Sequence, residues 1–132
     1  MAQRQRVVIG MLGLDQHEMG ARAVSRLLRD AGFEVVYLGK FNTPARFARV
    51  AIEEDADLIG ISAHSWEYLD QVPELLRTLS AQDLAIPVVV GGSVITPSDA
   101  SALKAAGVAE VFGPGTPSEF IVERLRALAR PG

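Results

Sequence analysis

Five short runs of apolar, mostly β-branched residues constrain the fold of this chain more than any other feature. They lie at residues 6–12, 34–38, 57–62, 86–91 and 109–113. Most are apolar almost throughout instead of alternating with polar residues, as in strands that are buried on both faces of a parallel sheet. We therefore expect five parallel strands with helices covering both faces.

Helical patterns separate these runs and follow the last one. In each pattern, apolar residues recur three and four positions apart and so share one face of a helix. The residues are Val24, Leu27, Leu28 and Ala31; then Phe47, Val50 and Ala51; then Leu69, Val72, Leu75, Leu76 and Leu79; then Ala102, Leu103 and Ala106; and finally Phe120, Ile121, Leu125 and Leu128. Five strands alternating with five helices predict a right-handed, doubly wound α/β sheet of the flavodoxin-like type.

The expected helix boundaries agree with this pattern. The dipeptide Thr-Pro precedes three helices, at 43–44, 96–97 and 116–117. Threonine can cap the open amides, and proline suits the first helical position. "TPSE" at the last of these sites is a capping-box pattern. Gly32 and Gly107 follow the first and fourth helices, where a left-handed residue ends a helix.

Composition limits the kind of protein and its partners. A chain of 132 residues has room for one domain, and we expect residues 1–132 to form it. The net charge of −3 argues against nucleic acid or an anionic membrane as a partner. The absence of cysteine excludes thiolate chemistry and fits a reducing compartment. No run approaches the ~20 apolar residues of a membrane helix, so we expect a soluble, cytoplasmic protein.

Ligands of doubly wound sheets bind outside the carboxyl ends of the strands. The segments expected at this edge are 13–20, 39–43, 62–68, 91–96 and 113–116. They do not suit a phosphoacceptor receiver domain, which needs an aspartate and a lysine where this chain has Ser62 and Gly113. They also lack the G-x-G-x-x-G spacing of a dinucleotide site and a Walker-type phosphate loop.

Both histidines of the chain, His17 and His64, fall at this edge. With Asp15 or Glu18 they offer nitrogen and oxygen ligands for zinc or iron, although no H-E-x-x-H spacing supports such a site. A solvated loop imidazole is the ordinary alternative for His17. The residues alone leave these interpretations open.

The segment Asp15-x-His17-x-x-Gly20 follows the first strand and opens a helix. It matches the D-x-H-x-x-G motif of the cobalamin-binding, Rossmann-like domain shared by carbon-skeleton mutases and cobalamin-dependent methionine synthase. The stretches "RDAGFEVVYLG", "TPARFARVAIEEDADLIGIS", "VVVGG" and "PGT" resemble, in order and separation, parts of the small subunits and C-terminal domains of acyl-CoA mutases. The resemblance covers roughly residues 5–128.

This resemblance implies that cobalamin binds base-off, with its dimethylbenzimidazole tail removed from cobalt and His17 as the lower axial ligand of the metal. Asp15 would accept the proton of the other imidazole nitrogen, and Gly20 would leave room for the tail. The other residues implied to contact the tail are Ser62, Gly91, Gly92, Pro114, Gly115 and Thr116.

Two positions depart from the acyl-CoA mutase pattern. Met11 replaces the usual lysine, and here the chain resembles the glutamate mutase small subunit, which is apolar at this position. The S-x-L sequence after the third strand is here Ser62-Ala63-His64. We include His64 among the expected cofactor contacts. Trp66 and Tyr68 are expected either as plain loop residues or as contacts to the cofactor or a partner.

The resemblance implies an isomerase: the small subunit of an adenosylcobalamin-dependent carbon-skeleton mutase of the acyl-CoA type. Because the chain lacks the ~250 residues of a substrate-binding barrel, we expect a larger catalytic subunit as partner. A glutamate mutase-type small subunit, a corrinoid methyltransferase module and a non-enzymatic cobalamin carrier or sensor are the alternatives.

Overall fold

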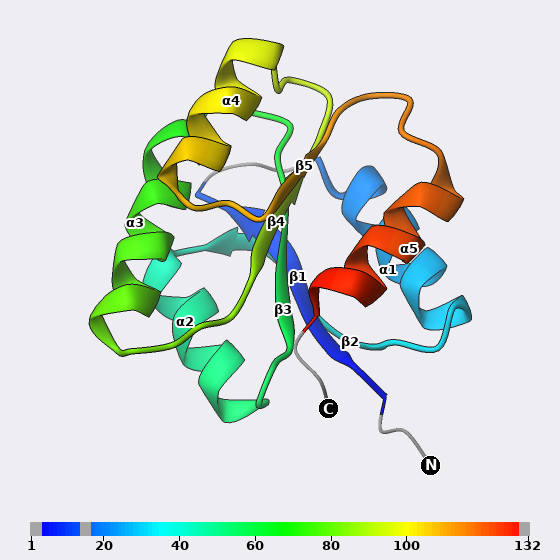
Figure 1. Ribbon diagram of the computed structural model, residues 1–132, viewed down its shortest axis with the longest axis horizontal. Coiled ribbons are helices and arrows are strands. Elements are labelled where there is room, and N and C mark those ends of the chain that lie inside the picture. The colour runs from blue at the N-terminus through cyan, green and yellow to red at the C-terminus, as the bar shows by residue number, and fades with distance from the viewer. Residues whose placement is uncertain (1–3, 14–16, 130–132) are drawn as a thin grey trace.

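The computed structural model describes residues 4–13 and 17–129, which form a five-stranded parallel sheet (Figure 1). The strands are β1 (Arg6–Leu12), β2 (Glu34–Asn42), β3 (Leu58–Ser62), β4 (Val88–Gly91) and β5 (Glu110–Phe112). Their spatial order is β2-β1-β3-β4-β5, and every neighbouring pair is parallel. This order confirms the predicted flavodoxin-like, doubly wound fold.

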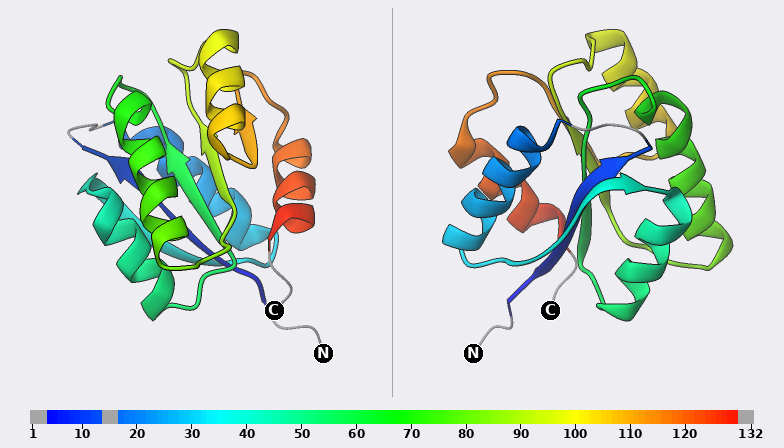
Figure 2. Two further views of the ribbon diagram at one scale, coloured as in Figure 1. Left: turned by 60° about the vertical axis from the view of Figure 1, so that its left-hand side comes forward. Right: turned by 180° about the vertical axis from the view of Figure 1, so that it is seen from behind.

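Five helices cover the sheet: α1 (Glu18–Asp30), α2 (Pro44–Glu53), α3 (Tyr68–Ala81), α4 (Pro97–Ala106) and α5 (Ser118–Leu128). Figures 1 and 2 show α1 and α5 on one face and α2, α3 and α4 on the other. Each helix follows a strand and so begins at the carboxyl edge of the sheet. The first turns of all five helices therefore surround the edge at which a ligand site is expected.

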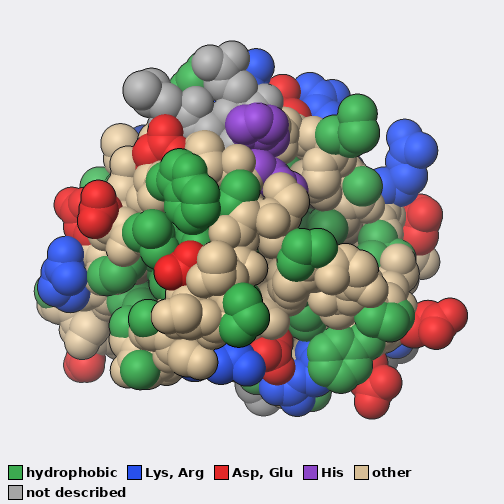
Figure 3. Space-filling model, turned by 90° about the horizontal axis from the view of Figure 1, so that it is seen from above, with side chains coloured by type: hydrophobic (Ala, Val, Ile, Leu, Met, Phe, Trp, Pro, Cys, Tyr) green, Lys and Arg blue, Asp and Glu red, His purple; other side chains and the backbone are tan. Residues whose placement is uncertain are grey.

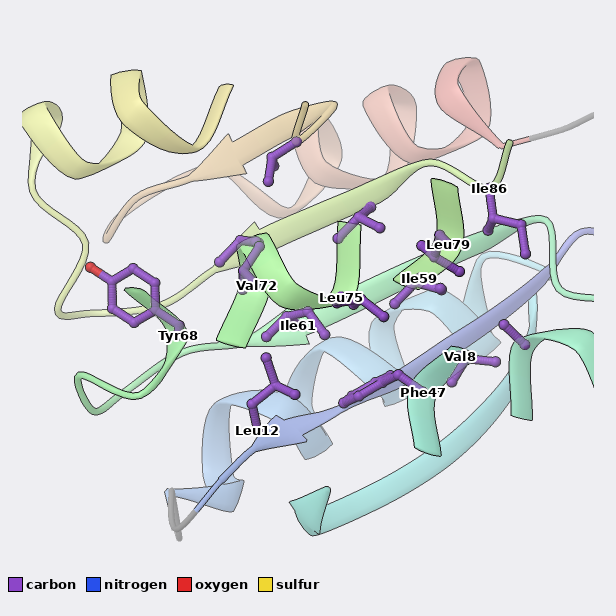
Figure 4. Close-up of a cluster of buried hydrophobic side chains, with 14 of the residues drawn as sticks. Val8, Leu12, Phe47, Ile59, Ile61, Tyr68, Val72, Leu75, Leu79 and Ile86 are labelled. Carbon is purple, nitrogen blue, oxygen red and sulfur yellow. The ribbon is translucent and has the colours of Figure 1, made fainter. Parts of the chain in front are cut away.

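The face covered by α2, α3 and α4 holds the larger apolar cluster. Figure 4 shows its centre, where Phe47 from α2 and Leu75 and Leu79 from α3 pack against Val8 and Ile59 of the sheet. All five side chains are buried. A second cluster fills part of the space between the sheet and the α1–α5 layer.

Strand β2 is longer than the predicted 34–38, and residues 39–42 extend it where a loop was expected. The buried side chain of Asn42 explains the extension. Its amide donates hydrogen bonds to the carbonyl oxygens of Met11 (3.0 Å) and Gly39 (2.8 Å). These bonds hold the end of β2 against β1 across two shifts of register.

The predicted caps are correct at two of the three Thr-Pro sites. The hydroxyls of Thr43 and Thr96 accept hydrogen bonds from the backbone N–H groups of Arg46 (3.1 Å) and Asp99 (3.0 Å). The prediction for Thr116 is wrong, because α5 begins one residue later, at Ser118, without a side-chain cap. Gly32 and Gly107 follow their helices with φ of 100° and 120°, as predicted.

Four residues predicted on buried helix faces are exposed: Leu69, Ala102, Ala106 and Phe120. Leu69 and Phe120 lie in first turns, at the edge where the strands end, so the sheet does not cover them. Helix α4 packs on α3 and β5 through a single buried side chain, that of Leu103.

Candidate functional site at the carboxyl edge of the sheet

A cavity of about 280 Å³ lies between the sheet and the α1–α5 layer. Its deep walls are aliphatic and come from β1, β3, β4, α1 and α5: Val7, Ile9, Val24, Leu28, Leu58, Val89, Ile121 and Leu125. Toward the carboxyl edge its lining becomes polar, with Ser62, His64, Ser93 and Thr116. Such a cavity suits a ligand that is mostly apolar but carries polar atoms at one end.

Glycines keep this cavity open and bring its loops together. A Cβ on Gly20, in the first turn of α1, would lie 2.8 Å from Nε2 of His64 and 3.8 Å from Oγ of Ser62. A Cβ on Gly92, in the loop after β4, would lie 1.7 Å from the carbonyl oxygen of Ala63. The loops after β3 and β4 are thus in direct backbone contact.

That contact aligns three polar side chains at the mouth of the cavity. Nε2 of His64 lies 3.0 Å from Oγ of Ser62, and Nδ1 lies 3.0 Å from Oγ of Ser93. The backbone N–H of Ser93 also donates to Nδ1 over 3.4 Å. The half-buried imidazole of His64 therefore bridges the loops after β3 and β4.

His17 lies beside this bridge, at the residue that precedes α1. Its side chain is exposed, and its ring centroid is 6.1 Å from that of His64. Figure 3, which looks onto the carboxyl edge, shows the two histidine side chains next to each other. The predicted partner of His17, Asp15, lies outside the described residues.

The first turn of α1 is held to β2 by Glu18, the neighbour of His17. The Tyr37 hydroxyl donates a 2.8 Å hydrogen bond to this carboxylate, and Arg22 and Lys40 lie 3.5 and 3.6 Å away. The hydrogen bond from Tyr37 and the two cations lower the pKa of Glu18 below its ordinary value. These contacts tie the first turn of α1, which directly follows His17, to Tyr37 and Lys40 of β2.

The structure brings most of the predicted site residues together. Those that line the cavity are Gly20, Ser62, His64, Gly91, Gly92, Pro114, Gly115 and Thr116. Thr116 also donates a 2.7 Å hydrogen bond to the carbonyl oxygen of Gly113, which closes the turn after β5. Their roles toward a cofactor stay predictions.

Sequence reasoning missed Ser93 and the deep aliphatic wall. The position of Ser93, directly after two glycines at the expected edge, is the signal that could have indicated it. The residues Val24, Leu28 and Ile121 were predicted as core, because an apolar helix face has the same pattern whether it meets a neighbour or a cavity.

The described residues contain no group of three histidine, cysteine, aspartate or glutamate side chains that could hold a metal ion. Within residues 4–13 and 17–129, His17 and His64 thus gain no third ligand for the zinc or iron site. In the same part of the chain, no helix is long and apolar enough to cross a membrane.

The comparisons of the sequence with known proteins agree on one family. The sequence profile described as "B12 binding domain" matches residues 5–120. The pivalyl-CoA mutase small subunit of Xanthobacter autotrophicus is 43% identical over 125 residues, which is 95% of this chain and 84% of that protein. The 2-hydroxyisobutanoyl-CoA mutase small subunit of Aquincola tertiaricarbonis is 37% identical over 123 residues, 93% of this chain and 90% of that one.

Solved structures show the same fold. A cobalamin-binding protein from Desulfitobacterium hafniense superposes with a TM-score of 0.83 at 20% identity, over 97% of this chain and 60% of that one. The receiver domain of NarL from Mycobacterium tuberculosis superposes with a TM-score of 0.72 at 17% identity, over 95% of both chains. At these identities the likeness concerns the fold alone. On the evidence of its sequence, the chain belongs to the B12-binding domain family, together with the small subunits of these acyl-CoA mutases.

Proposed function

We propose that this chain is the cobalamin-binding small subunit of an adenosylcobalamin-dependent acyl-CoA mutase, with His17 as the lower axial ligand of cobalt. The observation that carries the proposal is the cavity between α1 and the sheet, which is lined by His64, whose ring centroid lies 6.1 Å from that of His17. A tail displaced from cobalt by His17 needs such a space directly beside the ligand.

The residues present fit this cofactor. Gly20, three residues after His17, lines the cavity, and a Cβ there would meet the side chains of His64 and Ser62. The deep aliphatic wall suits the dimethylbenzimidazole ring, and the polar mouth faces the more polar parts of the tail. Pro114, Gly115 and Thr116, in the turn after β5, also line the cavity.

When bound, the cofactor would supply a cobalt–carbon bond whose homolysis starts a radical 1,2-rearrangement. The task of this chain is to position that cofactor. The exposed imidazole of His17 presents a nitrogen ligand, while Glu18 and its three partners hold the first turn of α1 in place. Asp15 is proposed to orient the imidazole through its other nitrogen.

We further propose that a larger catalytic subunit covers the carboxyl edge, as the relatives' designation "small subunit" suggests. Met19, Phe41 and Trp66 are large apolar side chains that are exposed in segments at this edge. Exposed apolar residues grouped around a cofactor site are typical of a protein interface. The same relatives favour a mutase over a methyltransferase module or a cobalamin carrier.

A spectroscopic titration of the purified chain with cob(II)alamin tests the axial ligand. We expect a paramagnetic resonance signal split by one nitrogen, with the splitting altered by ¹⁵N-histidine labelling. In His17→Ala the histidine splitting should disappear. Met19→Ala, an exposed change two residues away, is the matched control and should keep it. A labelled-histidine splitting that persists in His17→Ala contradicts the proposal.

A further inference from the structure

The tie between β2 and the first turn of α1 depends mainly on Tyr37. Its hydroxyl donates a 2.8 Å, partly buried hydrogen bond to the Glu18 carboxylate. A hydrogen bond to a charged group is roughly twice as strong as a neutral one. The two cations beside Glu18 contribute less to this tie. Arg22 belongs to α1 itself, and Lys40, whose side chain is 36% exposed, forms an ion pair over 3.6 Å, a type of contact that adds little stability.

Tyr37 itself belongs to a rigid part of the fold. It pairs with Ile9 at the end of the regular register between β1 and β2, and the register shifts directly after this pair. Its ring packs against the second apolar cluster, between the sheet and the α1–α5 layer. A side chain held by a strand and by packing is a more precise support than one carried by a loop.

The chain before His17 is also held by β2. The backbone N–H of Gly13, directly after β1, donates to the carbonyl oxygen of Asn42 over 2.8 Å. The buried side-chain amide of Asn42 donates to the carbonyl oxygen of Met11 over 3.0 Å. His17 comes four residues after Gly13 and directly before Glu18. Strand β2 therefore holds the chain on both sides of the expected axial ligand.

We propose that Tyr37 is a positioning residue for the axial ligand: through Glu18 it keeps the first turn of α1, and with it the imidazole of His17, where that imidazole can bind cobalt. Under the proposed function, on which this inference rests, the chain then presents His17 before the cofactor arrives. Only molecules with the imidazole in place bind without further ordering, so the apparent affinity falls in proportion to their fraction.

The first test needs no cofactor. Amide hydrogen exchange of the full chain, followed by NMR, reports on the backbone hydrogen bonds that close the first turn of α1. We expect Tyr37→Phe to speed the exchange of the Ala21 and Arg22 amides by roughly 10-fold, the scale of one hydrogen bond to a charged group.

Tyr68→Phe is the matched control for this exchange. It also removes a hydroxyl that donates to a carboxylate, that of Asp99, but it does so on the opposite face of the sheet. It should leave the exchange of the Ala21 and Arg22 amides unchanged. Equal acceleration by both variants, or by neither, would overturn the inference.

The second test compares cobalamin with cobinamide, which keeps cobalt and the corrin ring but lacks the nucleotide tail. Both can take the imidazole of His17, so Tyr37→Phe should weaken the binding of both by the same factor, roughly 5- to 10-fold. Tyr68→Phe should leave both affinities unchanged. A loss confined to cobalamin would assign the effect of Tyr37 to the tail cavity and overturn the inference.

A double-mutant cycle shows whether Tyr37 acts through Glu18. In a Glu18→Ala background, Tyr37→Phe should have no further effect on either affinity. Glu18→Gln keeps an acceptor oxygen for the hydroxyl and should restore much of the binding that Glu18→Ala loses. An undiminished effect of Tyr37→Phe in the Glu18→Ala background would overturn the inference.

The two proposals fail in different ways. A wild type that binds neither ligand contradicts the proposed function, and the role of Tyr37 toward cobalt with it, whatever the exchange rates are. A wild type that binds both ligands through His17, with affinities that Tyr37→Phe does not change, contradicts this inference alone.

Discussion

At the scale of single residues, the candidate site depends on glycines at points where no side chain fits. Gly20 and Gly92 serve different purposes. Gly20 leaves space next to a side chain, that of His64, whereas Gly92 lets two backbones meet. The difference has an energetic consequence, since a side chain can move aside but the backbone of a buried strand end cannot do so without disturbing the sheet.

Gly92→Ala should therefore lower the free energy of unfolding by about 1–3 kcal/mol or more, the usual cost of forcing extra volume into a packed region. The added Cβ would lie 1.7 Å from the carbonyl oxygen of Ala63. Gly113→Ala is the control, because a Cβ there meets nothing within 4 Å. Urea unfolding followed by circular dichroism measures both, and equal losses for the two variants would contradict this account.

The sequence resemblance picks out Gly20, Gly91 and Gly92, and the structure places all three in the lining of the cavity, while their roles toward a cofactor stay predictions. The sequence does not indicate that His64 bridges Ser62 and Ser93. That contact joins residues 29 positions apart and depends on how closely two loops approach each other. Local propensity and hydrophobic periodicity carry no information about such a distance.

At the scale of elements, three Thr-Pro dipeptides look alike in sequence but do not act alike. The hydroxyls of Thr43 and Thr96 cap α2 and α4, whereas that of Thr116 donates to the carbonyl of Gly113. A tight turn after a short strand thus competes with the cap for the same hydroxyl. Capping rules describe the local preference of a residue and cannot tell which partner tertiary structure brings closer.

Replacing each threonine by alanine should separate the two roles. Thr43→Ala and Thr96→Ala each remove an acceptor from a helix N-terminus and should lower the free energy of unfolding by about 1 kcal/mol. Thr116→Ala should cost less, within roughly 0.5 kcal/mol, because its hydrogen bond is exposed and caps no helix. Thermal and urea unfolding give the values, and a loss for Thr116→Ala as large as the other two would contradict the assignment.

At the scale of the whole molecule, the two faces of the sheet are filled differently. The face under α2, α3 and α4 is packed throughout its centre, and the face under α1 and α5 contains the cavity. The alternation of strands and helices along the chain and most of the core follow from periodicity, since both faces need apolar residues. The cavity cannot be predicted from periodicity, because an apolar side chain that lines a space looks the same in sequence as one that meets a neighbour.

Tyr68 closes the packed face near the carboxyl edge, and its hydroxyl should make the molecule less stable at alkaline pH. Its ring is buried against the cluster in Figure 4, and its hydroxyl donates a 3.0 Å hydrogen bond from α3 to Asp99 in α4. Burial and, to a lesser degree, the hydrogen bond to Asp99 raise the pKa of Tyr68 to about 12. The unfolded chain ionises near pH 10, so the folded state binds this proton more tightly.

Because the pKa of Tyr68 is raised in the folded state, the protonated hydroxyl contributes its full stabilisation of the fold below about pH 10. This contribution is lost as the pH rises toward 12. Ionisation would place a phenolate inside the packed face and beside the Asp99 carboxylate. Tyr68→Phe lacks the ionisable group, so its stability should fall less steeply over this range. The advantage of the wild type over the variant, measured by urea unfolding, should shrink by roughly 2 kcal/mol between these pH values. An advantage that stays constant would show that the folded and unfolded chains release this proton alike, and that the Tyr68 hydroxyl is not held between α3 and α4.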